Sequence, residues 1–200
     1  MPLRASIKLK IGAAAGIAAP VLAFVCIIGA IGTAPSFSWA SNALSDLGID
    51  PGVTGPLFNF GLYASGFLGL VFAVFGLFSY LGKTNAGKVG ASMFVAATAT
   101  LVGIGVFNES FSGTHFALSA TFFVLAPVSL FIITYDFAIS RRKQAAVLTL
   151  STGVVAALPW VVLFVFRFVP NVAIPETISA LAVSAWTIAV CSRILAQTKH

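Results

Sequence analysis

Six uninterrupted apolar stretches of about 20 residues or more run through this chain, at about 11–33, 56–80, 88–107, 115–138, 145–169 and 177–196. About 20 helical residues cross the hydrocarbon core of a bilayer. A transmembrane β-barrel would instead show alternating segments of about 10 residues, and these stretches do not alternate. The pattern therefore predicts an all-α integral membrane six-helix bundle, with residues 1–200 forming a single transmembrane domain.

The composition excludes a water-soluble fold. Hydrophobic residues make up 59% of the chain and charged residues 8%, against roughly 25% charged in typical soluble domains. The first apolar stretch, of about 23 residues, exceeds the 7–15 residues of a signal-peptide core. We interpret it as a membrane span, although the small residues Gly32, Thr33 and Ala34 leave cleavage as an alternative.

The basic residues are distributed in a way that predicts the orientation. With six spans, every lysine and arginine except Arg167 falls on the side of the two termini, which is ten of the eleven. Cytoplasmic loops are enriched in lysine and arginine, so both termini are predicted to be cytoplasmic. Four of the five acidic residues fall on the outer side. The remaining one, Asp136, is predicted to form a weak surface ion pair with Arg141 or Arg142.

The longest outer link, about 34–55, contains the polar segment SNALSDLG. From 39 to 48 its apolar and polar residues fall on opposite faces of a helix. This predicts a short amphipathic helix lying at the outer membrane surface, anchored by Trp39. Asp46 would lie in the last turn of that helix, where the helix dipole disfavours an anion. Asp46 is therefore predicted to be either fully solvated or paired.

Arg167 lies near the outer end of the fifth stretch. One interpretation is an anchor whose guanidinium reaches the headgroups. The other is an inward-facing arginine that pairs with Asp46, Glu109 or Glu176, because intramembrane ionisable groups usually face the bundle interior. Under the second interpretation, Arg167 and the outer carboxylates form one polar pocket.

A polar turn joins the third and fourth stretches and contains Asn108, Glu109, Ser110 and His115, with Ser119 one helical turn further on. His115 and Ser119 share a helix face. A histidine and a glutamate can act as acid and base, and a nearby serine can act as nucleophile. Candidate catalytic residues are therefore His115, Glu109 and Ser119, but a histidine at a helix start more often serves as a hydrogen-bonding residue.

Neither a metal nor another cofactor is expected. A catalytic zinc site usually has three protein ligands, often histidine or cysteine. The two histidines, His115 and His200, fall on opposite sides of the predicted bundle. The two cysteines, Cys26 and Cys191, lie at different predicted depths, so a disulfide between them is not expected.

Several segments resemble the six-span prokaryotic family called domain of unknown function 998. They are FSWASNALSDLGID (37–50), PLFNFGLYASG (56–66), LVGIGVFNES (101–110) and HFALSATFF (115–123). The resemblance covers nearly the whole chain and implies a six-helix bundle with both termini inside. It implies no activity, because the activity of that family is not established.

The chain is also similar to the eukaryotic group that includes the damage-regulated autophagy modulators. Ser45, Asp46 and Gly48 match a Ser-Asp-x-Gly element after the first span. Asn108 and His115 match an N-x-x-E…H element, although Glu109 directly follows Asn108 and so departs from its spacing. This similarity implies a lipid-facing role.

Three hypotheses follow for function. The first is a prokaryotic plasma-membrane protein that binds or handles lipid through a polar pocket at the outer leaflet. Its ligand-binding candidates are Ser45, Asp46, Asn108, Glu109, His115 and Arg167, with Arg167 or His115 meeting a phosphate headgroup. The second is a metal-independent lipid hydrolase or transferase, and the third is an accessory subunit of a membrane complex. Membrane lipid is the expected partner, a protein partner or homo-oligomer stays open, and nucleic acid is not expected.

Overall fold

The computed structural model describes residues 3–81 and 83–198, and within them six helical segments are long and apolar enough to cross a membrane. His200, considered above as a metal ligand, lies outside the described residues. No β-strand occurs in the part of the chain that the structure describes. The prediction of an all-α chain with six candidate membrane spans is therefore confirmed.

The spans are α1 (Leu3–Gly32), α2 (Thr54–Val71) continued by η2 and α3, α4 (Asn85–Val106), α5 (Ser112–Ile139), α6 (Lys143–Phe166) and α7 (Ala173–Gln197). The second span passes from α2 through a π-helical turn, η2 (Phe72–Leu77), into α3 (Phe78–Leu81). The fifth span ends at Phe166, before the predicted 169. It ends there because Arg167 adopts a left-handed backbone conformation, with φ 46°.

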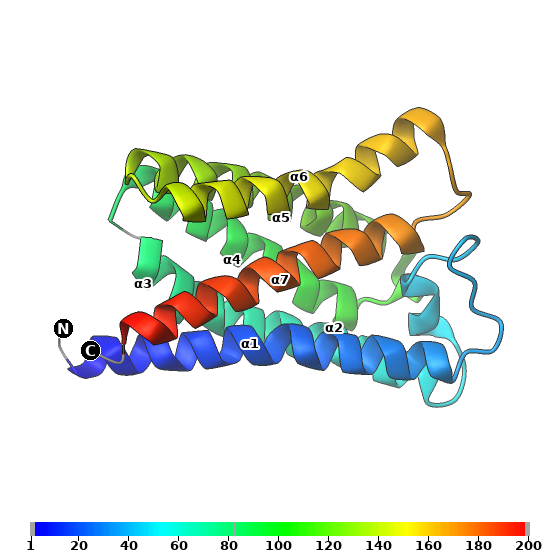
Figure 1. Cartoon of the computed structure of the whole chain (residues 1–200). Helices are drawn as coiled ribbons and strands as arrows, with labels where there is room; N and C mark the ends of the chain where they lie inside the picture. The colour runs from blue at the N-terminus through cyan, green and yellow to red at the C-terminus, as the bar shows by residue number, and fades with distance from the viewer. Residues whose placement is uncertain (1–2, 82, 199–200) are drawn as a thin grey trace.

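Successive spans run antiparallel, so α1 begins and α7 ends at the same end of the bundle (Figure 1). We call this the terminal end. The distal end is the opposite one, formed by segments 33–53, 107–111 and 167–172. Which end faces the cytoplasm stays a prediction that rests on the basic residues.

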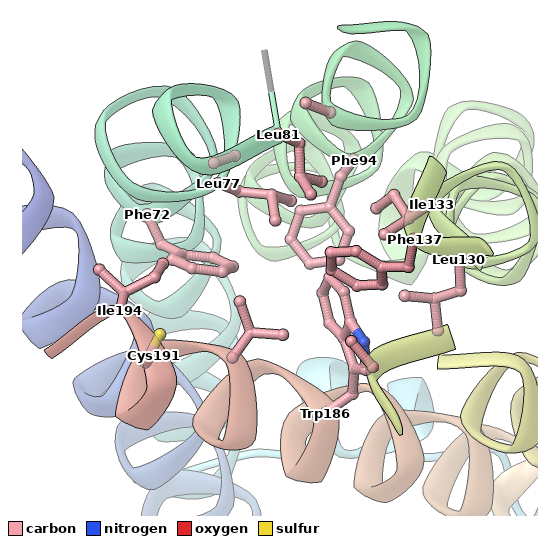
Figure 2. Close-up of a cluster of buried hydrophobic side chains, with 14 of the residues drawn as sticks. Phe72, Leu77, Leu81, Phe94, Leu130, Ile133, Phe137, Trp186, Cys191 and Ile194 are labelled. Carbon is pink, nitrogen blue, oxygen red and sulfur yellow. The ribbon is translucent and has the colours of Figure 1, made fainter. Parts of the chain in front are cut away.

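The core of the terminal half is closely packed around Trp186, which is completely buried (Figure 2). Phe94 packs against its ring with 5.5 Å between centroids, and Phe72 packs edge-on against Phe94 at 5.9 Å. The indole Nε1 of Trp186 donates a hydrogen bond of 2.9 Å to Thr149 Oγ1. A buried indole N–H normally needs such a partner, so this bond ties α7 to α6 inside an apolar core.

Glycines allow α1 to pack closely against the second span. A Cβ placed on Gly12 would lie 2.3 Å from the backbone nitrogen of Gly76, and one on Gly61 would lie 2.4 Å from the Cβ of Cys26. Small residues at helix contacts are typical of membrane bundles, because close packing holds the helices together where the hydrophobic effect does not. Gly12 and Gly61 therefore serve close helix packing.

The Gly12→Ala variant is expected to lower the free energy of unfolding by about 1 kcal/mol, because the added methyl group overlaps backbone that cannot rotate away. The matched control is Gly32→Ala in the same helix, where an added Cβ meets nothing within 4 Å. The measurement is the temperature at which detergent-solubilised protein loses its monodisperse size-exclusion peak. Equal midpoints for the two variants would contradict the prediction.

The prediction for Asp136 is wrong. This residue is only 3% exposed, and its Oδ1 accepts a hydrogen bond from the Thr84 hydroxyl. Thr84 caps α4 by accepting the Gly87 N–H at 2.8 Å. Arg142 instead lies over the Tyr80 ring, 4.3 Å from its centroid, and burial together with the nearby Arg193 lowers the pKa of Arg142. Asp136 therefore fixes the start of a helix inside the terminal end and is no surface ion-pairing group.

The two cysteines are buried and free, so the prediction that they form no disulfide is confirmed. Cys26 packs where α1 passes Gly61 of α2. Cys191 belongs to the core of the terminal half, on α7 (Figure 2). Their different positions along the bundle agree with the depths predicted from the sequence and give both residues the role of small apolar side chains.

Candidate functional site

The long distal loop folds into the bundle, and the predicted surface amphipathic helix over 39–48 is not formed. The segment contains turns and a short 3-10 helix, η1 (Ser45–Ile49). Leu44 and Leu47 are 6% and 1% exposed and belong to an apolar cluster with Phe58 and Ile104. The loop therefore covers the distal end of the bundle. It is drawn in blue to cyan in Figure 1.

Asp46 explains why an α-helix does not form there. It stands in the first turn of η1 and not in the last turn of a helix. Its Oδ2 accepts the Ala43 N–H at 3.0 Å and the Asn42 side-chain amide at 2.6 Å. Aspartate side chains compete in this way with helical hydrogen bonds. Asp46 is therefore paired, with amide donors of its own loop and not with a cation.

Glu176, near the start of α7, anchors the loop to the rest of the bundle. Its Oε2 accepts the backbone N–H of Leu44 at 2.7 Å, although 132 residues separate the two in the chain. Two further bonds join the same segments, from Ala173 N to the Asn42 carbonyl and from Asn171 Nδ2 to the Ser41 carbonyl, both 3.1 Å. The α6–α7 link and the loop therefore form one connected layer.

A second set of contacts joins η1 to the junction of α4 and α5. The Ser45 hydroxyl donates to Glu109 Oε1 at 2.6 Å. Glu109 begins the short 3-10 helix η3 (Glu109–Phe111). Asn108 Nδ2 and Asn59 Nδ2 both donate to the Gly48 carbonyl, at 3.4 and 2.8 Å. Ser45, Asn108 and Glu109 are thus brought together, as the sequence suggested, and Asn108 serves the loop backbone.

His115 stands in the first turns of α5 and is 6% exposed. Its Nδ1 lies 2.7 Å from the Phe107 carbonyl oxygen, which can only accept, so Nδ1 carries the hydrogen. Its Nε2 is buried and finds no hydrogen-bond partner among the described residues. In the neutral ring Nε2 is a hydrogen-bond acceptor, so an acceptor is left unsatisfied at this position.

These residues surround a cavity of about 540 Å³ at the distal end, which we call the distal cavity. Its polar lining includes Ser45, Asp46, Glu109, His115, Asn171 and Glu176. The rest of its lining is largely apolar and comes from α5 and α6: Phe116, Ala120, Phe123, Val124, Trp160 and Phe164. Phe116 and Phe164 are 73% and 76% exposed, so the apolar side reaches the lipid-facing surface.

Trp160 is held in this wall by a defined network. Its ring packs against Phe123 with 4.7 Å between centroids. Its Nε1 donates to Ser179 Oγ at 2.9 Å, and Ser179 Oγ donates to the Ala156 carbonyl at 2.6 Å. Pro159 lies in this part of α6 and has no N–H to offer its own helix. These hydrogen bonds therefore fix the cavity wall to α7 at the point where Pro159 leaves α6 without one of its backbone hydrogen bonds.

A smaller apolar cavity of about 130 Å³, the interior cavity, lies among α1, α2, α4, α5 and α7. Ser45, Ser119, Phe123 and Glu176 line both cavities. Ser65, 2% exposed, lines the interior cavity and leaves its hydroxyl without a partner among the described residues. The two spaces therefore adjoin at a wall that is partly polar.

Arg167 does not join this group, so the inward-facing interpretation is wrong. Its side chain is exposed, and it is not one of the described residues that line the distal cavity. The left-handed conformation that ends α6 places it in the α6–α7 link. Among the described lining residues there is no lysine or arginine. Of the two residues proposed to meet a phosphate headgroup, only His115 therefore lines the cavity.

The catalytic candidates are close in the chain but do not form a dyad. Ser119 and His115 are one helical turn apart, and no hydrogen bond joins their side chains within the described residues. Nucleophile and base normally stand within hydrogen-bond reach. No group of three or more histidine, cysteine, aspartate or glutamate residues in 3–81 and 83–198 is placed to hold a metal ion. His115 and Ser119 therefore do not form a nucleophile–base pair in this structure.

Sequence reasoning missed Trp160 and the role of Glu176, which was considered only as a partner of Arg167. The signal for Glu176 was present: a carboxylate inside a helix of mostly apolar residues is costly unless it has a partner. Trp160 carried no such signal, because an aromatic residue in an apolar span can face lipid or the bundle equally well. Only the three-dimensional packing of α5 against α6 identifies it.

A family model described as "Protein of unknown function (DUF998)" matches residues 17–193. The match includes all six candidate spans, although it begins within the first and ends within the last. Comparisons with curated proteins and with solved structures found no match.

Proposed function

This chain belongs to the DUF998 family of proteins of unknown function, and we propose that it binds an amphipathic molecule of the membrane in the distal cavity. The polar group of the ligand lies beside Glu109, His115 and Glu176. Its apolar tail lies along Phe116, Trp160 and Phe164. By the orientation predicted from the basic residues, the ligand comes from the outer leaflet.

The observation that carries this proposal is that one cavity combines two chemistries. Three carboxyl groups and a histidine contribute to its lining, together with aromatic and aliphatic side chains of α5 and α6. Small-molecule sites are commonly apolar pockets of about 300–1,000 Å³ with a few convergent polar groups. A volume of about 540 Å³ falls in this range. Exposed Phe116 and Phe164 would let a tail enter sideways from the bilayer.

The loop that covers the cavity favours a preformed site. Asp46, Glu109 and Glu176 each accept a hydrogen bond from the loop or from η1. The polar groups are thus held in place before a ligand arrives, which limits the entropic cost of binding.

The test is fluorescence quenching by an amphiphile with bromine atoms on its tail, titrated into detergent-solubilised Trp39→Phe protein. That background leaves Trp160 in the cavity wall and Trp186, which is completely buried in the terminal half. Bromine quenches only at short range. We expect saturable quenching in this protein and its loss when Trp160→Phe is added, because the tail would lie against Trp160.

Trp160→Phe keeps an aromatic side chain in the wall and serves as the matched control. Thermal stability close to that of the parent protein shows that the fold is retained. Quenching that rises linearly with amphiphile and is equal in both proteins would refute the proposal, since that is the behaviour of unspecific partitioning.

A further inference from the structure

We propose that the polar group of this ligand is a protonated amine. This inference rests on the proposed function and deepens it by naming the chemistry of the head group. It follows from the charges and the free hydrogen-bonding atoms of the distal cavity.

Three carboxylates line the cavity: Asp46, Glu109 and Glu176. In the described part of the chain, protein donors reach one oxygen of each, namely Asp46 Oδ2, Glu109 Oε1 and Glu176 Oε2. All of these donors are neutral amides or hydroxyls, and none is a cation. The second oxygens of Asp46 and Glu109 remain available as acceptors, and no lysine or arginine among the described lining residues compensates the negative charge of these two groups.

His115 supplies an independent observation. This residue lines the same cavity, and only 6% of its surface is exposed. Its Nε2 has no hydrogen-bond partner among the described residues. Because Nδ1 donates to the Phe107 carbonyl, the neutral ring presents Nε2 as an acceptor. A buried polar atom without a partner is unusual in a native fold. A ligand that donates hydrogen bonds would satisfy it.

An ammonium group matches this arrangement both in its charge and in its hydrogen bonding. It carries a positive charge and three hydrogen-bond donors and has no acceptor. A phosphate would bring negative charge to the carboxylates and would find no lysine or arginine among the described lining residues. A metal ion is disfavoured because no group of three or more potential ligands is suitably placed in the described residues. A neutral hydroxyl would supply donors without compensating charge.

The test compares three amphiphiles that share one brominated C18 tail and carry an amine, a hydroxyl or a phosphate head, at pH 7. Half-saturation of Trp160 quenching is measured in the Trp39→Phe background. We expect the amine to saturate at a concentration at least tenfold below that of the alcohol and the phosphate to bind most weakly. The advantage of the amine should shrink as salt is added.

The double variant Asp46→Asn, Glu109→Gln removes charge but keeps oxygen acceptors for Ala43 and Ser45. We expect it to bring the half-saturation concentration of the amine within about threefold of that of the alcohol, because the charge that favours the amine is gone. Asp50→Asn is the matched control, because Asp50 belongs to the same loop but does not line the cavity. If the double variant loses thermal stability, the comparison of the three head groups in the Trp39→Phe protein is the test of the amine proposal.

The remaining outcomes separate this inference from the proposed function. Equal half-saturation for amine and alcohol, or a preference for phosphate, would overturn the amine head while leaving amphiphile binding intact. Absence of saturable quenching by every amphiphile would overturn both. A brominated phosphatidylethanolamine and phosphatidylglycerol pair then identifies the source: a preference for the former assigns the ammonium to a diacyl aminophospholipid, and binding of neither assigns it to a single-chain amine.

Discussion

The Glu176→Ala variant is expected to lose about 2 kcal/mol of unfolding free energy and to loosen the distal loop. The Leu44 N–H donates to Glu176 Oε2 at 2.7 Å in a buried setting. A buried donor that loses its partner costs about 1–3 kcal/mol. The measurements are the thermal midpoint of the solubilised protein and the rate of limited proteolysis within 34–53, which should rise as the loop detaches.

Glu176→Gln is the control, because its amide oxygen can still accept the Leu44 N–H. We expect its thermal midpoint to stay close to that of the unmodified protein. Loop proteolysis unchanged in Glu176→Ala would show that the loop is held by its other contacts, such as Ala173 N to the Asn42 carbonyl, and would contradict the anchoring role.

The Ala120→Trp variant is expected to weaken binding of the amphiphile at least tenfold, which corresponds to about 1.4 kcal/mol. Ala120 lies on α5 and lines the distal cavity beside Phe116 and Val124. A bulky ring at this position would occupy the space proposed for the tail. The measurement is the half-saturation concentration of an amphiphile followed by native mass spectrometry, which does not depend on tryptophan fluorescence.

Ala117→Trp is the matched control on the same helix. Ala117 is exposed and is not among the described residues that line either cavity, so this variant adds the same ring to the lipid-facing surface. We expect it to bind normally and to unfold at the same temperature. Equal loss of binding in the two variants would show that the effect is unspecific, and full binding in Ala120→Trp would place the tail elsewhere.

Local properties of the chain decide much of the fold, and those could be predicted from the sequence. The length of each apolar stretch determines that it can cross a bilayer as a helix. Clustering of Glu109 and His115 was expected because both belong to one short turn. These features depend on residues close together in the sequence, so no knowledge of the packing was needed.

Contacts between distant segments decide the candidate site, and only the tertiary structure identified those. An isolated segment 39–48 has the pattern of an amphipathic helix, yet Leu44 finds its hydrogen-bond acceptor in Glu176 on the last span. Asp136 of α5 accepts a hydrogen bond from Thr84 at the start of α4, and Arg167 is exposed in the α6–α7 link, where α6 ends in a left-handed conformation. A polar group is placed by whichever partner satisfies its hydrogen bonds at least cost, and for Leu44, Ser45 and Asp136 that partner lies in a distant segment of the chain.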